Sequence, residues 1–170
     1  MITVSDAIIK MIADSEGSQH DICHFMKVWA YARTIGQAEG LDAKTLETLE
    51  FAAVVHDIAC PSLKKERGTA PGALQEEYGP ALVRELFQDA GMDDEMLDRI
   101  CYLVAHHHTY TDIDGMDYQI LLEADFLVNA GEQDKYRKTA ESFYKNVFRT
   151  KTGRELLKEM FLRDNEQMDE

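Results

Sequence analysis

Apolar residues recur at intervals of three and four along most of this chain, which is the spacing of amphipathic helices. In the segment at about 21–39, Phe25, Val28, Ala32 and Ile35 fall on one helical face. Alternation of apolar and polar residues, the pattern of a half-buried strand, is rare. The pattern therefore predicts an all-α protein that folds as a single helical bundle.

Capping and breaking residues divide this pattern into separate helices. Gly40 is a predicted C-terminal cap. Asp42 and either Asp93 or Asp94 are predicted N-terminal caps, and Pro61 forces an exit from the helix before it. Charged residues, Gly and Pro predict loops at about 62–72 and 109–115. Helices are predicted from Val4 to the break at Gly17, and at about 21–39, 43–58, 73–90, 93–107, 118–130, 134–148 and 153–163. No linker long enough to split the chain is visible, so residues 1–170 are expected to form one domain.

Composition narrows the functional classes. The net charge of −14 disfavours binding to a nucleic acid polymer, although a bound cation would still allow a small anionic substrate. No apolar run approaches the roughly 18 residues that span a bilayer, so no membrane partner is expected. Three cysteines without a CxxC motif favour a reducing compartment, and a cytoplasmic protein is the expectation. The oligomeric state stays open.

Four polar residues stand in segments that are otherwise apolar. His56 and Asp57 end the apolar run 51–55, His24 lies on the buried face of the segment 21–39, and Asp125 interrupts the apolar segment 120–128. Burying such groups costs several kcal/mol unless each has a partner. A divalent cation between the helices satisfies all four, although each residue taken singly also fits a hydrogen-bonded core position. The joint pattern favours the metal site.

Two further clusters are candidates for contacts with a substrate. Lys64, Lys65 and Arg67 follow the doublet closely, and they form either a solvated loop or a loop that steers phosphate. His106, His107 and His108 lie at the end of a predicted helix. We expect at least one of the three to line the site and contact a phosphate or a second metal. The alternative is an exposed helix end, where the helix dipole stabilises cationic histidine.

Three short segments together resemble a known family. They are His24-Phe25-Met26-Lys27-Val28, Val54-Val55-His56-Asp57-Ile58 and Glu123-Ala124-Asp125. In order and spacing they resemble the HD-domain metal-dependent phosphohydrolase superfamily, over a core of about 19–131, with C-terminal helices at about 134–163. The resemblance implies an all-α fold, a mono- or dinuclear divalent metal site, and hydrolysis of a phosphoester or nucleotide.

The resemblance also indicates which of two HD doublets marks the ligand, and the chain departs from the family pattern at one position. His20-Asp21 is a second HD doublet, but in a branch of the superfamily with a similar opening the later histidine is the ligand. His24 is therefore the expected ligand and His20 a residue at the pocket rim or helix start. Many members carry Lys or Glu three residues after the doublet Asp to assist catalysis, and Cys60 stands there in this chain.

These observations predict a metal-dependent phosphohydrolase for a small phosphomonoester or nucleotide. His24, His56, Asp57 and Asp125 are the predicted ligands, which suit Mn, Fe, Co, Ni or Zn better than Mg. His56 and Asp57 are the predicted catalytic residues, with metal-activated water as nucleophile and Asp57 able to bridge a second metal bound by His106 or His107. Substrate contacts are predicted for Lys64, Lys65, Arg67, His106 and His107. A diiron oxygenase of the same superfamily and a non-catalytic metal- or nucleotide-binding regulatory domain are the alternatives.

Overall fold

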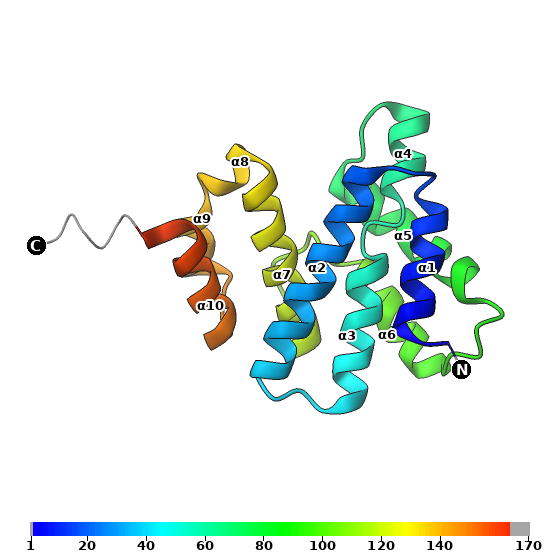
Figure 1. Ribbon diagram of the computed structural model, residues 1–170, viewed down its shortest axis with the longest axis horizontal. Coiled ribbons are helices and arrows are strands. Elements are labelled where there is room, and N and C mark those ends of the chain that lie inside the picture. The colour runs from blue at the N-terminus through cyan, green and yellow to red at the C-terminus, as the bar shows by residue number, and fades with distance from the viewer. Residues whose placement is uncertain (1, 164–170) are drawn as a thin grey trace, which may run out of the picture.

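The structure is a computed structural model that describes residues 2–163, and these residues form helices without any strand (Figure 1). The helices are α1 (Val4–Asp14), α2 (Gln19–Ala38), α3 (Ala43–Val55), α4 (Cys60–Arg67), α5 (Gly72–Phe87), α6 (Asp94–Val104), α7 (Met116–Glu132), α8 (Asp134–Arg137), α9 (Ala140–Asn146), α10 (Lys151–Leu157) and the π-helical turn η1 (Lys158–Leu162). The all-α prediction is confirmed.

The predicted capping residues set several helix ends. The side chain of Asp42 accepts hydrogen bonds from the backbone N–H groups of Lys44 and Thr45, both at 3.0 Å. Asp93 caps α6 in the same way, at 3.3 Å from the N–H of Met96. Side-chain oxygens at these positions satisfy N–H groups that have no partner inside the helix.

The predicted loop at about 62–72 is wrong for most of its length, because α4 occupies residues 60–67. Pro61 starts this helix instead of only ending the previous one, since proline fits the first turn, where no backbone N–H is needed. Gly68 ends α4 in a left-handed conformation with φ of 76°. The charge-rich composition of α4 therefore marks an exposed helix.

Other predicted boundaries shift by a few residues. The helix predicted to reach Ile58 ends at Val55, and the one predicted to reach His107 ends at Val104. The single helix predicted at 134–148 is two short ones, α8 and α9. As a consequence, the HD doublet and the histidine triplet both lie just past helix ends, where side-chain directions no longer follow helical periodicity.

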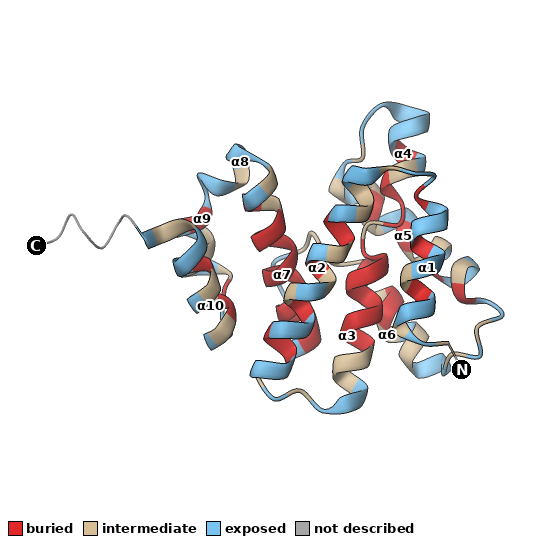
Figure 2. Ribbon diagram, viewed as in Figure 1, coloured by how far each residue is buried: buried red, intermediate tan, exposed pale blue. Residues whose placement is uncertain are grey.

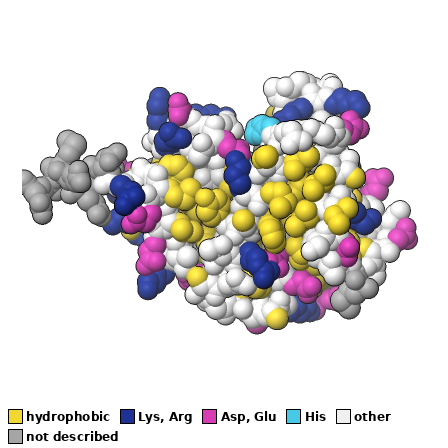
Figure 3. All heavy atoms as spheres, viewed as in Figure 1, with side chains coloured by type: hydrophobic (Ala, Val, Ile, Leu, Met, Phe, Trp, Pro, Cys, Tyr) yellow, Lys and Arg dark blue, Asp and Glu magenta, His cyan; other side chains and the backbone are white. Residues whose placement is uncertain are grey.

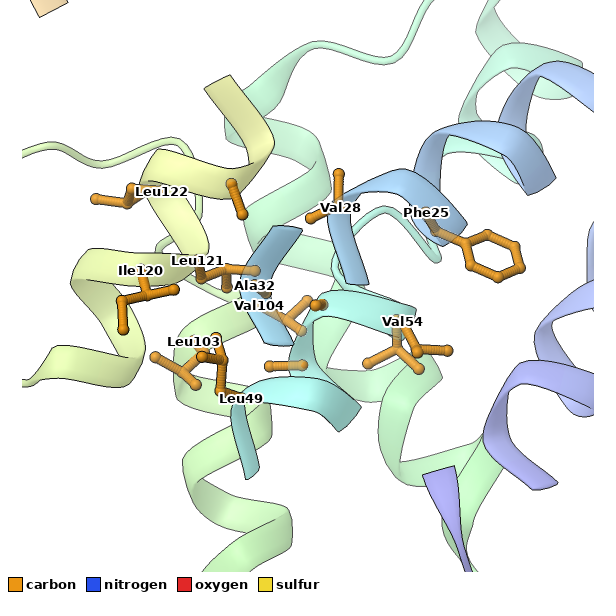
Figure 4. Close-up of a cluster of buried hydrophobic side chains, with 14 of the residues drawn as sticks. Phe25, Val28, Ala32, Leu49, Val54, Leu103, Val104, Ile120, Leu121 and Leu122 are labelled. Carbon is orange, nitrogen blue, oxygen red and sulfur yellow. The ribbon is translucent and has the colours of Figure 1, made fainter. Parts of the chain in front are cut away.

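α2 lies at the centre of the bundle, packed against α3 on one side and α7 on the other (Figure 1). α3 and α7 are buried along most of their length (Figure 2). Figure 4 shows apolar side chains from four helices meeting in this core: Phe25, Val28 and Ala32 of α2, Leu49 and Val54 of α3, Leu103 and Val104 of α6, and Ile120, Leu121 and Leu122 of α7. The buried polar side chains of α7 must therefore find partners inside the protein.

On the surface, hydrophobic side chains gather over the face formed by α1, α2 and α3, with charged groups around them (Figure 3). Ile9 and Ile12 of α1 are among the exposed large hydrophobic residues. None of the helices within residues 2–163 has the length and hydrophobicity needed to cross a membrane.

Candidate metal centre

Three helices bring the four predicted ligands to one place in the core. His24 lies in the second turn of α2, His56 and Asp57 directly follow α3, and Asp125 lies in the middle of α7. His24, His56 and Asp125 are buried, whereas one quarter of the Asp57 side chain, 27%, is exposed. The bundle thus encloses three of the groups and leaves the fourth open to solvent.

The separations between donor atoms fit a shared cation. His24 Nε2 lies 3.3 Å from His56 Nε2, 3.2 Å from Asp125 Oδ1 and 3.4 Å from Asp57 Oδ2. His56 Nε2 lies 3.5 Å from Asp125 Oδ1 and 3.6 Å from Asp57 Oδ1. Donors about 2.1 Å from one transition-metal ion in tetrahedral geometry lie about 3.4 Å apart. Each of the two histidine nitrogens therefore lies at ligand spacing from the other and from both carboxylates. The donor atoms of His24, His56 and Asp57 all lie within 4.8 Å of one another.

A second group of potential ligands adjoins the first through Asp57. His107 and His108 form with Asp57 a cluster in which one donor atom of each lies within 4.8 Å of the others. His107 Nε2 is 3.3 Å from Asp57 Oδ1, but this buried nitrogen has no partner in hydrogen-bonding geometry within residues 2–163. Buried polar atoms are rarely left unpaired, so this atom too fits a metal ligand.

Hydrogen bonds on the far side of the rings fix how the imidazoles point. His56 Nδ1 lies 2.8 Å from the carbonyl oxygen of Ala53, and His107 Nδ1 lies 2.7 Å from that of Val104. A carbonyl only accepts, so each Nδ1 carries the proton and each Nε2 faces the centre. His108 Nε2 lies 3.1 Å from the side-chain oxygen of Gln75 and donates to it.

The titration of these groups reflects their mutual charges. Burial alone raises the pKa of Asp57, but the neighbouring His56 and His107 hold it well below its usual range. Burial lowers the pKa of His24, but the hydrogen bond to Asp125 and the charge of Asp57 raise it to about 9. Burial and the charge of His107 lower the pKa of His108 to about 4. The carboxylates thus stay ionised and attract positive charge to the centre.

The centre opens into a cavity of about 210 Å³. Lys64 and Lys135 bring positive charge to its wall, and His20 lines it at the position expected for a rim residue. Lys64 is held by Asp21, whose carboxylate lies 2.9 Å from its ammonium group. Cys60 and Tyr136 also line the cavity. The wall therefore combines two lysines with the carboxylates of Asp21 and Glu132, next to the ligand cluster.

Three predicted substrate contacts lie away from this cavity. Because α4 is a helix, successive side chains point about 100° apart, and only Lys64 of the basic cluster reaches the wall. Lys65 points toward Glu16 and lines a separate hollow, and Arg67 is exposed near the end of α4. His106 stacks on the ring of Tyr102, at 4.1 Å between centroids. Of the histidine triplet, His107 and His108 lie beside Asp57, but only His108 lines the cavity, because His107 is fully buried.

Sequence reasoning missed a row of polar residues on α7. Asn129 donates from Nδ2 to Asp125 Oδ1 at 2.9 Å, and Glu132 Oε2 lies 2.9 Å from His24 Nδ1. Both line the cavity. Asn129 and Glu132 follow Asp125 by four and seven residues, so they share its helical face, and this spacing was the available signal.

Comparison with known proteins places the chain in a family. Residues 21–141 match the HD domain, whereas no curated protein matches the chain. A crystal structure of a predicted HD superfamily hydrolase from an uncultured Thermotogales bacterium is similar in fold, with a TM-score of 0.67 and 23% sequence identity, covering 96% of this chain and 86% of that one. The family match spans most of the chain and includes every residue of the clustered histidines and carboxylates: this protein belongs to the HD-domain superfamily.

Proposed function

We propose that this protein is a metal-dependent phosphohydrolase that acts on a small phosphomonoester or nucleotide. The observation that carries the proposal is the position of the His24 and His56 Nε2 atoms, each 3.2–3.6 Å from the other and from a carboxylate oxygen of Asp57 and of Asp125, beside a cavity with lysines in its wall. A divalent cation held there lowers the pKa of a bound water and supplies hydroxide near neutral pH.

The residues of the chain have separate roles in this proposal. His24, His56, Asp57 and Asp125 hold the ion, and their mixed nitrogen and oxygen donors favour Mn, Fe, Co, Ni or Zn over Mg. Lys64 and Lys135 bind phosphate oxygens at the cavity wall, and His20 adds a donor at the rim. Asp57, with its partly exposed carboxylate, faces both the buried ligands and the entering substrate.

The direct test is release of inorganic phosphate from a panel of nucleoside phosphates and sugar phosphates, with Mn²⁺ or Co²⁺ added to metal-stripped protein. We expect turnover that depends on the added metal and disappears with a chelator. Bound metal confirmed by elemental analysis, with no phosphate released across the panel, contradicts the proposal.

A second candidate is favoured by the cluster of Asp57, His107 and His108. It supplies the additional histidines that a dinuclear iron oxygenase of the superfamily needs, and it equally suits a dinuclear hydrolase. Two irons per chain together with substrate-dependent oxygen uptake support the oxygenase. Two metals per chain with phosphate release and no oxygen uptake support the dinuclear hydrolase.

A further inference from the structure

The imidazoles at the centre differ in the group that pairs with Nδ1, the ring nitrogen on the side away from the other ligands. His56 and His107 each use a main-chain carbonyl three residues earlier, from Ala53 and Val104. Both carbonyls belong to the last turn of a helix, where carbonyl groups lack a partner within the helix. These two rings are therefore oriented by the local chain.

His24 has no such local partner. It lies inside α2, where the preceding carbonyls are used by the helix itself. Its Nδ1 instead lies 2.9 Å from Oε2 of Glu132, the last residue of α7 and 108 positions away in sequence. A side chain from another helix therefore accepts the Nδ1 hydrogen bond and orients the His24 ring, whereas backbone carbonyls do this for His56 and His107.

The carboxylate of Glu132 is itself fixed. Its other oxygen, Oε1, lies 2.6 Å from the ammonium group of Lys27, and its side chain is only 15% exposed. Lys27 stands one helical turn beyond His24 on α2, so the carboxylate bridges two residues of the same helix face. The ion pair compensates the charge of Glu132 and prevents the carboxylate from turning away from the ring.

We propose that Glu132, held by Lys27, is a positioning residue for the metal centre: it keeps the proton of His24 on Nδ1 and directs the Nε2 lone pair at the ion. A carboxylate behind a ligating histidine fixes its tautomer and increases its basicity. This inference rests on the proposed function only in requiring a divalent metal at the centre, and it does not depend on the reaction that the metal supports.

The test compares Co²⁺ binding to wild-type protein, Glu132→Ala, Glu132→Gln and Lys27→Met. Affinity is measured by competition with a chelating dye, and ligand geometry by the visible absorption of bound Co²⁺. Glu141→Gln is the matched control, because Glu141 pairs with Lys145 at the same 2.6 Å but on the exposed surface of α9. Circular dichroism checks that each variant is folded.

We expect Glu132→Ala to weaken Co²⁺ binding by roughly 10- to 100-fold and to change the absorption spectrum. Glu132→Gln keeps one accepting oxygen for His24 Nδ1 but places its NH₂ group against Lys27, so it should recover part of the affinity. Lys27→Met should have an intermediate effect. The control should bind as the wild type does. Wild-type affinity and an unchanged spectrum in folded Glu132→Ala would overturn the inference.

The outcomes separate this inference from the proposed function. Tight Co²⁺ binding that depends on Glu132, in a protein that releases no phosphate, supports the positioning role and contradicts phosphohydrolysis. If the protein releases phosphate and the Glu132 variants bind Co²⁺ as tightly as the wild type, the positioning role is contradicted and the proposed function is not. Equal losses of affinity in Glu132→Ala and Glu141→Gln would reduce the effect to a general change of charge and also overturn the inference.

Discussion

Two carboxylates on α7, Glu123 and Asp125, are both buried, yet their surroundings differ in kind. Two residues of helix correspond to a rotation of about 200°, so the two side chains point to opposite sides of α7. Glu123 faces the start of α10, and Asp125 faces α2 and the HD doublet. Burial alone therefore does not mark a carboxylate as functional.

The partners of Glu123 are fixed donors. Its Oε1 accepts from the backbone N–H groups of Arg149 and Thr150, at 2.7 and 3.0 Å, and from the side-chain amide of Gln119 at 2.8 Å. Its Oε2 accepts from the hydroxyl of Thr150, the N-terminal cap of α10. Four donors saturate this carboxylate, so it joins α7 to α10 and leaves no position for a ligand.

Most partners of Asp125 are imidazole nitrogens, which can carry either a proton or a metal ion. Asn129 is one fixed donor, and the other neighbours are Nε2 atoms of His24 and His56, which a proton or a cation can equally occupy. The comparison teaches that a buried acid surrounded by backbone N–H groups has a structural role, whereas one surrounded by imidazoles can bind a metal. The following changes test this distinction, from the largest expected effect to the smallest.

His56→Ala and Asp57→Ala should abolish metal-dependent turnover, by about 10³-fold or more, which corresponds to about 4 kcal/mol in the activation barrier. Each removes a donor that neighbouring groups cannot replace. Phosphate release measures the loss, and circular dichroism should show largely intact helical content. Turnover within tenfold of wild type in either variant would show that the catalytic centre lies elsewhere.

Asp125→Asn should weaken Co²⁺ binding by about 100-fold or more, since it alters a ligand directly and changes behind a ligand already cost 10- to 100-fold. Wild-type protein with Co²⁺ at 100 times its Kd should gain about 2.7 kcal/mol in the free energy of unfolding. Urea unfolding with and without the metal should show most of this gain missing in Asp125→Asn. A full gain would remove Asp125 from the ligand set.

Glu123→Gln, in contrast to Asp125→Asn, should lower the stability of the metal-free protein and leave metal binding unchanged. The amide places an NH₂ group against donors and removes charge-assisted hydrogen bonds, so the metal-free protein should lose about 3 kcal/mol in the free energy of unfolding. The gain from Co²⁺ should match that of the wild type. Loss of the metal effect in this variant would mean that the two sides of α7 are not independent.

Gly153→Ala tests the same contact from α10. A Cβ atom there would lie 2.0 Å from Glu123 Oε2, and the four donors prevent the carboxylate from retreating. We expect a loss of about 2 kcal/mol in unfolding free energy, typical of overpacking, with Co²⁺ affinity unchanged. Stability equal to wild type would show that α10 moves to accept the methyl group.

Much of the fold followed from local pattern. Apolar residues at three- and four-residue spacing located the main helices, and Asp42 and Asp93 cap helices as predicted. α4 was missed because its buried face is short, with only Cys60 and Leu63 buried in eight residues. A helix with so few buried apolar positions leaves little periodic signal in the sequence.

The sequence by itself determined the polar groups that the core must accommodate, since His24, His56 and Asp125 stand on apolar faces whose burial the periodicity requires. Only the tertiary structure decided which neighbours satisfy them. It turned His107 and His108, but not His106, toward Asp57, and it brought Glu132 to His24 from the far end of α7. The physical reason is that helical periodicity is local, whereas the direction of a side chain past a helix end, and the approach of two helices, depend on packing of the whole bundle.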